Sequence, residues 1–402
     1  MGKIAMDPVR NPYAPGAGSP PPELAGRQDI LDQAGIAISR TAQGRNTRSM
    51  ILVGLRGVGK TVLLNRIEQM ATDADFHALF IEAREGKSLP ELLVPGLRTA
   101  LYRMSAIEGA KDKARKGLRA LKSFVSSVKV TIEGVDIGVD VATGTADSGD
   151  LEADLPELML TVAIAAKAAK QPMIILLDEL QYLSETEFSA LIMSVHRINQ
   201  KNLPLIVVGA GLPQILGLAG SSKSYAERLF QYPAVGALSE KDAVKAIVNP
   251  AKEEGVIFTK GAVKSILDIT ERYPYFLQQW AYEAWNAAPT EKITEAIINK
   301  ATAAAIAELD QSFFKVRFDR CNPSERNYMR ALAELGTGTQ RSGDVAEVLG
   351  VKSTSVAPTR NALIKKGMVY SPSHGDTAFT VPMFDQYMLR AMPKFKPKRQ
   401  NR

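Results

Sequence analysis

The fold is decided by residues 50–61, which run Met50-Ile51-Leu52-Val53-Gly54-Leu55-Arg56-Gly57-Val58-Gly59-Lys60-Thr61. The first four residues are apolar and read as a buried strand. From Lys60 to Met70 apolar residues recur at helical spacing. Between these two patterns, glycines let the backbone curl so that successive N–H groups can face a phosphate, and the following helix start adds partial positive charge. The stretch predicts a strand, a phosphate-binding loop and a helix.

The loop matches G-x-x-x-x-G-K-[ST] in the context that this motif requires. Lys60 is expected to reach the β and γ phosphates of ATP, and the Thr61 hydroxyl is expected to be a ligand of Mg²⁺. We expect the nucleotide to contact the whole run: Gly54, Leu55, Arg56, Gly57, Val58, Gly59, Lys60, Thr61 and Val62.

A second apolar run, residues 174–177, ends in the carboxylates Asp178 and Glu179. In a parallel sheet such acids emerge at the carboxyl edge, where ligands bind. We expect Asp178 to hold Mg²⁺ through water and Glu179 to orient and polarise the attacking water, with Lys60 as a further catalytic group. Alternatively, either acid could cap the helix that starts near Gln181. The phosphate-binding loop upstream favours the catalytic interpretation.

Further apolar runs at residues 78–81 and 205–208, with helices between the strands, predict an α/β fold whose parallel sheet is covered on both faces. Residues 84–156 form a long insertion with a basic helical segment. Within it, the alternation over residues 128–141 predicts a β-hairpin. The expected domains are a flexible Pro/Gly-rich arm (1–22), the nucleotide-binding domain (23–238), a helical lid (239–321), a separate C-terminal domain (322–392) and a basic tail (393–402).

The C-terminal domain reads as three short helices, residues 323–335, 342–349 and 353–366, followed by two strands around the turn 373–376. This order resembles a winged helix, in which the third helix enters the major groove. Winged helices also dock proteins, so a protein partner is the alternative to duplex DNA. The residues expected at DNA are Ser353, Thr354, Ser355, Thr359 and Arg360, with Lys365 and Lys366 near phosphates.

The chain resembles the AAA+ ATPases over about residues 23–315, with Walker A at Gly54 to Thr61, Walker B at Leu176 to Glu179 and an entry motif at residues 24–27. It looks most similar to bacterial relatives of the origin-recognition and archaeal-type (STAND-like) ATPases, which carry an insertion before Walker B and a C-terminal winged helix. The resemblance implies that Gly26 and Arg27 line the adenine side. It also implies that Arg228 is an arginine finger or nucleotide sensor, although an ordinary surface arginine fits the same position.

Charge and composition exclude several classes of protein. The chain has 402 residues, a net charge of +7 and one cysteine, and it lacks an apolar run of about 18 residues, so neither a membrane span nor a disulfide framework is expected. Residues 1–22 lack the apolar core of a signal peptide, which predicts a cytoplasmic protein. Basic clusters at residues 98–129 and 390–402 attract phosphate backbones, although a solvated helix face or a disordered tail explains them too.

Residues Gly209-Ala210-Gly211 supply no polar side chain where many AAA+ proteins place a sensor, so we expect slow hydrolysis. Arg272 is a second sensor candidate, or a solvated turn residue. The leading hypothesis is a hydrolase that acts as a nucleotide-controlled DNA-binding switch. The alternative is a STAND-type signalling or scaffold ATPase whose winged helix docks a protein. Arg228 acting in trans would require a homo-oligomer.

Overall fold

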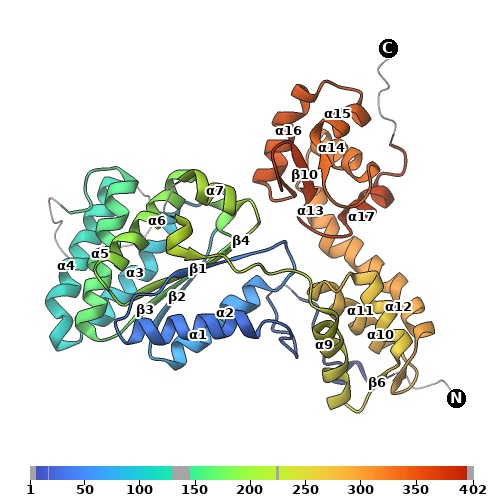
Figure 1. Ribbon diagram of the computed structural model, residues 1–402, viewed down its shortest axis with the longest axis horizontal. Coiled ribbons are helices and arrows are strands. Elements are labelled where there is room, and N and C mark those ends of the chain that lie inside the picture. Colours follow the sequence, from blue (N-terminus) through green and yellow to red (C-terminus); the bar gives the residue numbers. More distant parts are fainter. Residues whose placement is uncertain (1–5, 17, 129–144, 223–225, 396–402) are drawn as a thin grey trace. The chain divides into compact units, whose positions relative to one another are not determined.

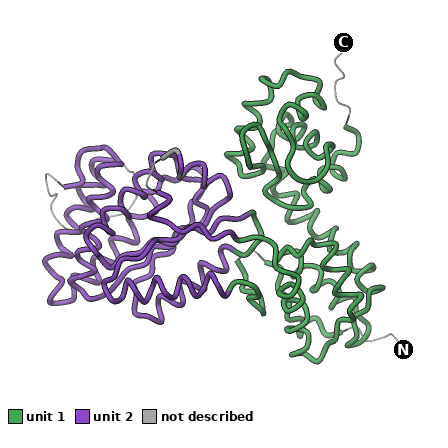
Figure 2. Tube along the Cα trace, in the orientation of Figure 1, with its two compact units in different colours: residues 1–27, 55–59, 235–402 green, residues 28–54, 60–234 purple. Residues whose placement is uncertain are grey.

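The computed structural model describes residues 6–16, 18–128, 145–222 and 226–395 (Figure 1). The chain divides into two compact units (Figure 2). Unit 1 contains residues 1–27, 55–59 and 235–402, and unit 2 contains residues 28–54 and 60–234. Among the described residues, no helix is both long enough and apolar enough to span a membrane.

Unit 2 is built on a five-stranded sheet in which every neighbouring pair is parallel. The strands follow one another across the sheet in the order β2 (His77–Glu82), β3 (Met173–Asp178), β4 (Leu205–Gly211), β1 (Ser49–Val53) and β5 (Phe230–Gln231). The predicted parallel α/β sheet is confirmed, with its strands where the apolar runs lie.

The central strands are buried on both faces, which explains why they are apolar without alternation. Ile51, Ile175 and Val207 belong to one core cluster with α3 (Leu89–Ser105), α5 (Leu151–Ala169) and α6 (Glu185–Gln200). Successive side chains of a strand point to opposite faces. Their neighbours therefore face the other side, where α1 (Gln28–Ala42) and α2 (Lys60–Asp73) lie (Figure 1).

The predicted basic segment forms α4 (Lys111–Ser127), which follows the short turn η2 (Glu108–Ala110) and packs against α3 and α5. Leu118, Leu121 and Phe124 are buried in that contact, whereas the opposite face is exposed and carries most of the cations. The β-hairpin predicted over residues 128–141 lies almost entirely outside the described residues. The remaining elements of unit 2 are η3 (Leu180–Tyr182), α7 (Ile215–Ser222) and α8 (Ala226–Leu229).

The longest segment of unit 1, residues 235–402, begins with a helical module that spans residues 235–321. Both tryptophans of the chain, Trp280 and Trp285, lie in its core. The module consists of α9 (Glu240–Glu253), β6 (Ile257–Phe258), α10 (Lys260–Thr270), α11 (Pro274–Ala287), β7 (Lys292–Ile293), α12 (Glu295–Glu308), the π-helical turn η4 (Leu309–Phe314) and α13 (Lys315–Asp319).

The C-terminal module, residues 322–395, contains the three helices and two strands expected from the sequence, with an additional short strand, β8, between the first two helices. Gly350 and Gly367 both have positive φ and follow α15 and α16, as expected for helix ends. The elements are α14 (Pro323–Glu334), β8 (Gln340–Arg341), α15 (Ser342–Leu349), α16 (Ser353–Lys365), β9 (Val369–Tyr370), β10 (Asp376–Phe379) and α17 (Phe384–Ala391). Strand β10 pairs antiparallel with both β8 and β9.

The prediction of a flexible arm over residues 1–22 does not hold for residues 7–13, which pack against the helical module. Tyr13 is only 2% exposed, donates a hydrogen bond to the Ile247 carbonyl and meets the edge of the Phe258 ring. The Trp285 indole donates to the Asp7 carbonyl at 3.1 Å. Ordering this segment costs conformational entropy, and the Pro/Gly-rich composition suggested that this cost would keep it flexible. Burial of one aromatic ring and these hydrogen bonds offset the cost.

Replacing Tyr13 with Ala should destabilise the helical module by about 3 kcal/mol, because a buried aromatic ring is lost and a cavity remains. Urea unfolding followed by tryptophan fluorescence measures this, since both tryptophans report on that module. Val9, 90% exposed in the same segment, provides the control: Val9→Ala should leave the unfolding curve unchanged. Equal effects of the two substitutions would contradict the packed arm.

Stability should also depend on His77, the first residue of β2. Burial lowers the pKa of this imidazole, and the charge of nearby Arg103 lowers it further. The folded state thus favours neutral His77, so its contribution is present above the ordinary pKa of about 6.5 and is lost as pH falls below that value. Thermal unfolding followed by circular dichroism should show that the melting temperature falls more between pH 7.5 and 5.5 for the wild type than for His77→Gln.

Candidate functional site

The predicted phosphate-binding loop leaves the sheet at Val53 and enters α2 at Lys60. Gly57 and Gly59 have φ of 81° and 93°, a region that residues with a Cβ rarely adopt. The Gly54 N–H donates to the Gly211 carbonyl at 3.1 Å, which ties the start of the loop to the end of β4. The glycine spacing of the motif is therefore a requirement of the backbone path.

Three predicted nucleotide-site residues of unit 2 meet at this edge of the sheet. The Thr61 hydroxyl donates to Asp178 Oδ2 at 2.5 Å, and the ammonium group of Lys60 donates to the Gly54 carbonyl at 2.9 Å. Lys60 and Asp178 are 7% and 3% exposed. The structure thus brings together a buried cation, a hydroxyl and a carboxylate at the carboxyl ends of parallel strands.

Electrostatics at Asp178 balance burial against its polar neighbours. Burial raises the pKa of the Asp178 carboxyl above its ordinary value, and the negative charge of Glu179 acts in the same direction. The hydrogen bond from Thr61 and the charge of Lys60 oppose this rise. A divalent cation at the carboxylate would lower the pKa of Asp178 strongly, in the same direction as Thr61 and Lys60.

The donor set fits Mg²⁺. Thr61 and Asp178 offer a hydroxyl and a carboxylate oxygen in direct contact, and Mg²⁺ is commonly bound by one or two such ligands together with water and substrate phosphates. No group of three or more His, Cys, Asp or Glu side chains among the described residues could hold a metal by itself. The residues present therefore suit a cation that arrives with a phosphate ligand.

Glu179 follows the strand in a left-handed conformation, with φ of 56°. This turn folds η3 back over the end of β4, where a Cβ at Gly209 would lie 2.4 Å from the Leu180 side chain. Gln181 donates to the Glu179 carboxylate and accepts from the Leu212 N–H at 3.1 Å. The glycines of β4 are thus needed for close packing, and the polar group at this place comes from Gln181.

The sequence did not identify Gln181 as a candidate residue of this site. It indicated residue 181 only as the start of a helix, because a lone glutamine two positions after the acidic pair carries no pattern. The only available signal was the pair of glycines at the end of β4, which indicated that another element approaches closely.

Arg27 lies against the loop, in unit 1. Its guanidinium donates to the carbonyl of Val58 at 3.2 Å and to that of Gly236 at 2.5 Å. Burial lowers the pKa of Arg27, and the charge of Asp242 acts in the opposite direction. Gly26 has φ of 66° and packs against the Asp242 side chain. Arg27 thus braces the loop backbone.

The two other arginines considered as nucleotide sensors, Arg228 and Arg272, do not take part in these contacts with the loop. Arg228 lies on α8 in unit 2, and its side chain is exposed. Arg272 follows α10 in unit 1 with φ of 61°, and its carbonyl accepts from the Leu238 N–H at 3.0 Å. Exposure of Arg228 suits either a surface residue or a group offered to another subunit.

The predicted DNA-facing residues of α16 fall into two groups. Ser353, Thr354, Ser355 and Lys365 are exposed, and Thr359 is half-buried. The first three form the beginning of the helix. These residues are accessible to a partner, and their contact with DNA remains a prediction.

Arg360 and Lys366 are corrections to that prediction, because their cationic groups are bound within the C-terminal module. Lys366 pairs with the buried carboxylate of Glu325 at 2.7 Å and donates to the Arg320 carbonyl at 3.0 Å. Position on the third helix suggested exposure, but the strands and α14 supply acceptors that sequence spacing does not reveal. Arg360 donates to three acceptors around the β9–β10 hairpin: Thr377 Oγ1 at 2.8 Å, Ser371 Oγ at 2.6 Å and the Asp376 carbonyl at 2.6 Å.

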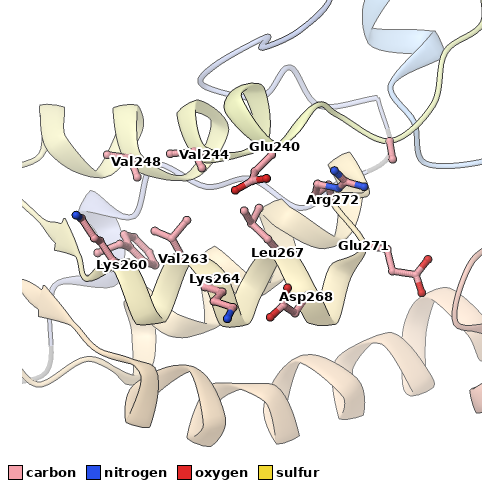
Figure 3. Close-up of a pocket in the computed structure, with 12 residues that line it drawn as sticks. Glu240, Val244, Val248, Lys260, Val263, Lys264, Leu267, Asp268, Glu271 and Arg272 are labelled. Atoms are coloured by element: carbon pink, nitrogen blue, oxygen red, sulfur yellow. The ribbon is translucent and has the colours of Figure 1, made fainter.

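A separate groove of about 1010 Å³ lies in the helical module (Figure 3). Val244 and Val248 of α9 face Val263 and Leu267 of α10 across it. The residues predicted to bind nucleotide, metal or DNA are not among those that line it. The sensor candidate Arg272 does line it, together with the charged residues Glu240, Lys260, Lys264, Asp268 and Glu271.

Comparisons with known proteins agree with this geometry. The family described as AAA ATPase domain matches residues 23–208, and a family described as a domain of unknown function (DUF8462) matches residues 311–388. No curated protein matches the chain.

Several solved structures are similar over nearly the whole chain. The structure of the Aeropyrum pernix ORC1 protein in complex with DNA is 16% identical, with a TM-score of 0.50 and coverage of 96% of each chain. The Aeropyrum pernix ORC2 protein (ADPNP-ADP complexes) is 14% identical, with a TM-score of 0.47 over 94% of this chain and 98% of that one. Cdc6p from Pyrobaculum aerophilum is 13% identical, with a TM-score of 0.45 over 97% and 99%.

At 16% identity, the similarity to ORC1 shows a shared fold only. The similarities to ORC2 and Cdc6p, with TM-scores below 0.5, carry no further argument. The family match covers the sheet as far as β4, including the loop and the acidic strand end. Residues 23–208 therefore form an AAA ATPase domain.

Proposed function

We propose that the chain binds Mg·ATP at the Gly54 to Val62 run, hydrolyses it slowly, and uses the bound nucleotide to control binding of duplex DNA. The observation that carries this proposal is the 2.5 Å contact between Thr61 and Asp178 beside buried Lys60. A hydroxyl, a carboxylate and an ammonium group at the end of a phosphate-binding loop match the needs of a Mg-bound triphosphate.

Each side chain has a role that follows from its chemistry. Lys60 places a positive charge at the β and γ phosphates, and the N–H groups of the loop donate to their oxygens. Thr61 is a direct Mg²⁺ ligand, and Asp178 holds the ion through water. The ion, when bound, neutralises phosphate charge. Glu179 orients the attacking water, and Gln181 fixes the position of the Glu179 carboxylate.

The end of β4 supports the proposal of slow turnover, because Gln181, the polar side chain at this place, is bound to Glu179 and to the Leu212 N–H. Gly209 and Gly211 carry no side chain to stabilise the attacking water, and the packing of Leu180 and Gln181 leaves no room for one. Loss of one well-placed stabilising group costs about 3 kcal/mol of barrier, a few hundred-fold in rate. Exposed Arg228, offered by a neighbouring copy of the chain, would supply part of this stabilisation in a homo-oligomer.

One exposed cationic helix, α4, and the exposed residues of α16 support a polyanionic partner. Helix α4 spans residues 111–127, so its cations from Lys111 to Lys122 extend over about 16 Å at 1.5 Å per residue, enough to meet several phosphates of a duplex. In the C-terminal module, Ser353, Ser355 and Lys365 are accessible at α16. Such contacts hold the DNA backbone and give little sequence specificity.

One observation favours the alternative, a STAND-type switch whose C-terminal module docks a protein. Arg360 and Lys366 are bound within that module, which reduces the charge that its third helix can present to phosphates. Salt separates the two functions. DNA binding through several phosphates weakens steeply as ionic strength rises, whereas docking through apolar and neutral contacts does not.

Lys60→Ala should weaken ATP binding by roughly 100-fold, about 3 kcal/mol, because a buried charge at the phosphates is removed. Binding of labelled duplex DNA, measured with ATP, with ADP and without nucleotide, should depend on nucleotide in the wild type and lose that dependence in Lys60→Ala. Lys201→Ala, at an exposed lysine of the same unit, is the control and should match the wild type. If no condition yields DNA binding, the DNA-switch proposal fails and the protein-docking alternative takes its place.

The double substitution Lys113→Glu and Lys116→Glu on exposed α4 should weaken DNA binding at every sequence tested and reduce the slope of log affinity against log salt by about 2. The matched control is Lys292→Glu with Lys300→Glu, which makes the same change in net charge at exposed positions of the helical module. Equal loss of affinity in both double variants would mean that overall charge, and not α4, attracts the DNA.

A further inference from the structure

Residues 55–59 of the loop belong to unit 1, where Tyr273, just before α11, and Tyr275, in its first turn, bind two of their carbonyls. The Tyr273 hydroxyl donates to the carbonyl of Arg56 at 2.7 Å, and the Tyr275 N–H donates to the carbonyl of Gly57 at 3.2 Å. A Cβ at Gly57 would lie 3.2 Å from the Cβ of Tyr275, so the approach is close. Tyr273 is only 6% exposed, and burial raises the pKa of its hydroxyl, which therefore stays a donor throughout the physiological range.

The next carbonyl along the chain is held as well. Arg27 donates to the carbonyl of Val58 at 3.2 Å, from a side chain that is 7% exposed. Three consecutive loop carbonyls, at residues 56, 57 and 58, are thus each bound by a donor from unit 1.

Holding these carbonyls orients the N–H groups that follow them. A peptide unit is planar and trans, so the C=O of one residue and the N–H of the next point in opposite directions. The bonds to residues 56, 57 and 58 therefore direct the N–H groups of Gly57, Val58 and Gly59 away from their carbonyl partners. These are N–H groups that a loop of this motif uses for phosphate, and none of them donates to a described residue.

The same segment is also bound to the C-terminal module. The Arg56 N–H donates to the carbonyl of Thr380 at 3.1 Å, and its guanidinium reaches the carbonyl of Gly367 at 3.5 Å. These two acceptors close the base of the β9–β10 hairpin, where the buried Thr380 hydroxyl donates to the Gly367 carbonyl at 2.6 Å. Arg56 therefore joins the phosphate-binding loop to the hairpin.

We propose that Tyr273 is a positioning residue for the phosphate-binding N–H groups and that Arg56 couples their order to the β9–β10 hairpin, so that ATP and the hairpin contact stabilise one another. The inference rests on the proposed function, because it presumes that the loop binds a nucleotide. Coupling of this kind is reciprocal: a ligand that orders the loop strengthens the Arg56 contact, and the contact raises the affinity for the ligand by the same factor.

Tyr273→Phe tests the first part, because it removes one hydroxyl and keeps the ring. The full-length variant should bind Mg·ATP about ten-fold more weakly, since the Arg56 carbonyl loses its partner and the peptide plane is no longer fixed. Tyr275→Phe is the matched control: the bond to Gly57 uses the Tyr275 backbone, so affinity should stay within about two-fold. Equal affinities of the two variants would overturn the role of Tyr273.

Hydrogen exchange of residues 367–381 in the full-length protein tests the coupling. ATP should slow exchange there in the wild type. At ATP concentrations that saturate each variant, Arg56→Ala, which loses the guanidinium contact but keeps the backbone bond to Thr380, should lose part of this protection. Arg56→Lys should recover some of it, and Arg66→Ala, at an exposed arginine of α2, should behave as the wild type. Unchanged tryptophan fluorescence and melting temperature in each variant identify the effect as one on the loop and not on folding.

The outcomes separate this inference from the proposed function. If the wild type binds ATP but exchange at the hairpin is the same with and without it, or if Arg56→Ala keeps the protection, the coupling is refuted and nucleotide binding stands. If the wild type binds no ATP, the proposed function fails and this inference fails with it.

Discussion

The hydrogen bond between Thr61 and Asp178 is the contact on which the rest of the candidate site depends. It joins the first turn of α2 to the end of β3, through two residues that are 117 positions apart in the chain. It forms because β1 and β3 are parallel and end at the same edge of one buried sheet. Two polar side chains can stay in so apolar a setting only when they satisfy each other or bind a ligand. The sheet thus concentrates its polar chemistry at one edge.

The phosphate-binding loop has a second constraint, which comes from unit 1. Its glycines allow the curled path, but three carbonyls and the Arg56 N–H are fixed by Tyr273, Tyr275, Arg27 and Thr380. The loop is therefore not an isolated local motif. A segment held in this way is suited to report nucleotide to distant elements, because any change in its path alters contacts with both modules of unit 1.

Local patterns predicted the sheet, the loop, the acidic strand end and most of the C-terminal elements, because strand periodicity and glycine requirements depend on neighbouring residues. They did not predict the short strand β8. They failed where partners are distant in sequence. Tyr13 donates a hydrogen bond to a helix more than 230 residues away in the chain. Arg360 donates to the β9–β10 hairpin. Gln181 reaches the Glu179 carboxylate because Glu179 adopts a left-handed conformation. None of these contacts leaves a periodic signal.

The most direct test of the account is calorimetric titration of ATP into the full-length protein, with Mg²⁺ and with a chelator, for the wild type and for Thr61→Ala. The Thr61–Asp178 pair as a Mg²⁺ site predicts that Mg²⁺ strengthens ATP binding by the wild type, whereas Thr61→Ala retains the weaker, Mg-free affinity and gains little from the ion. The absence of ATP binding by the wild type, or an equal gain from Mg²⁺ in both proteins, would contradict it.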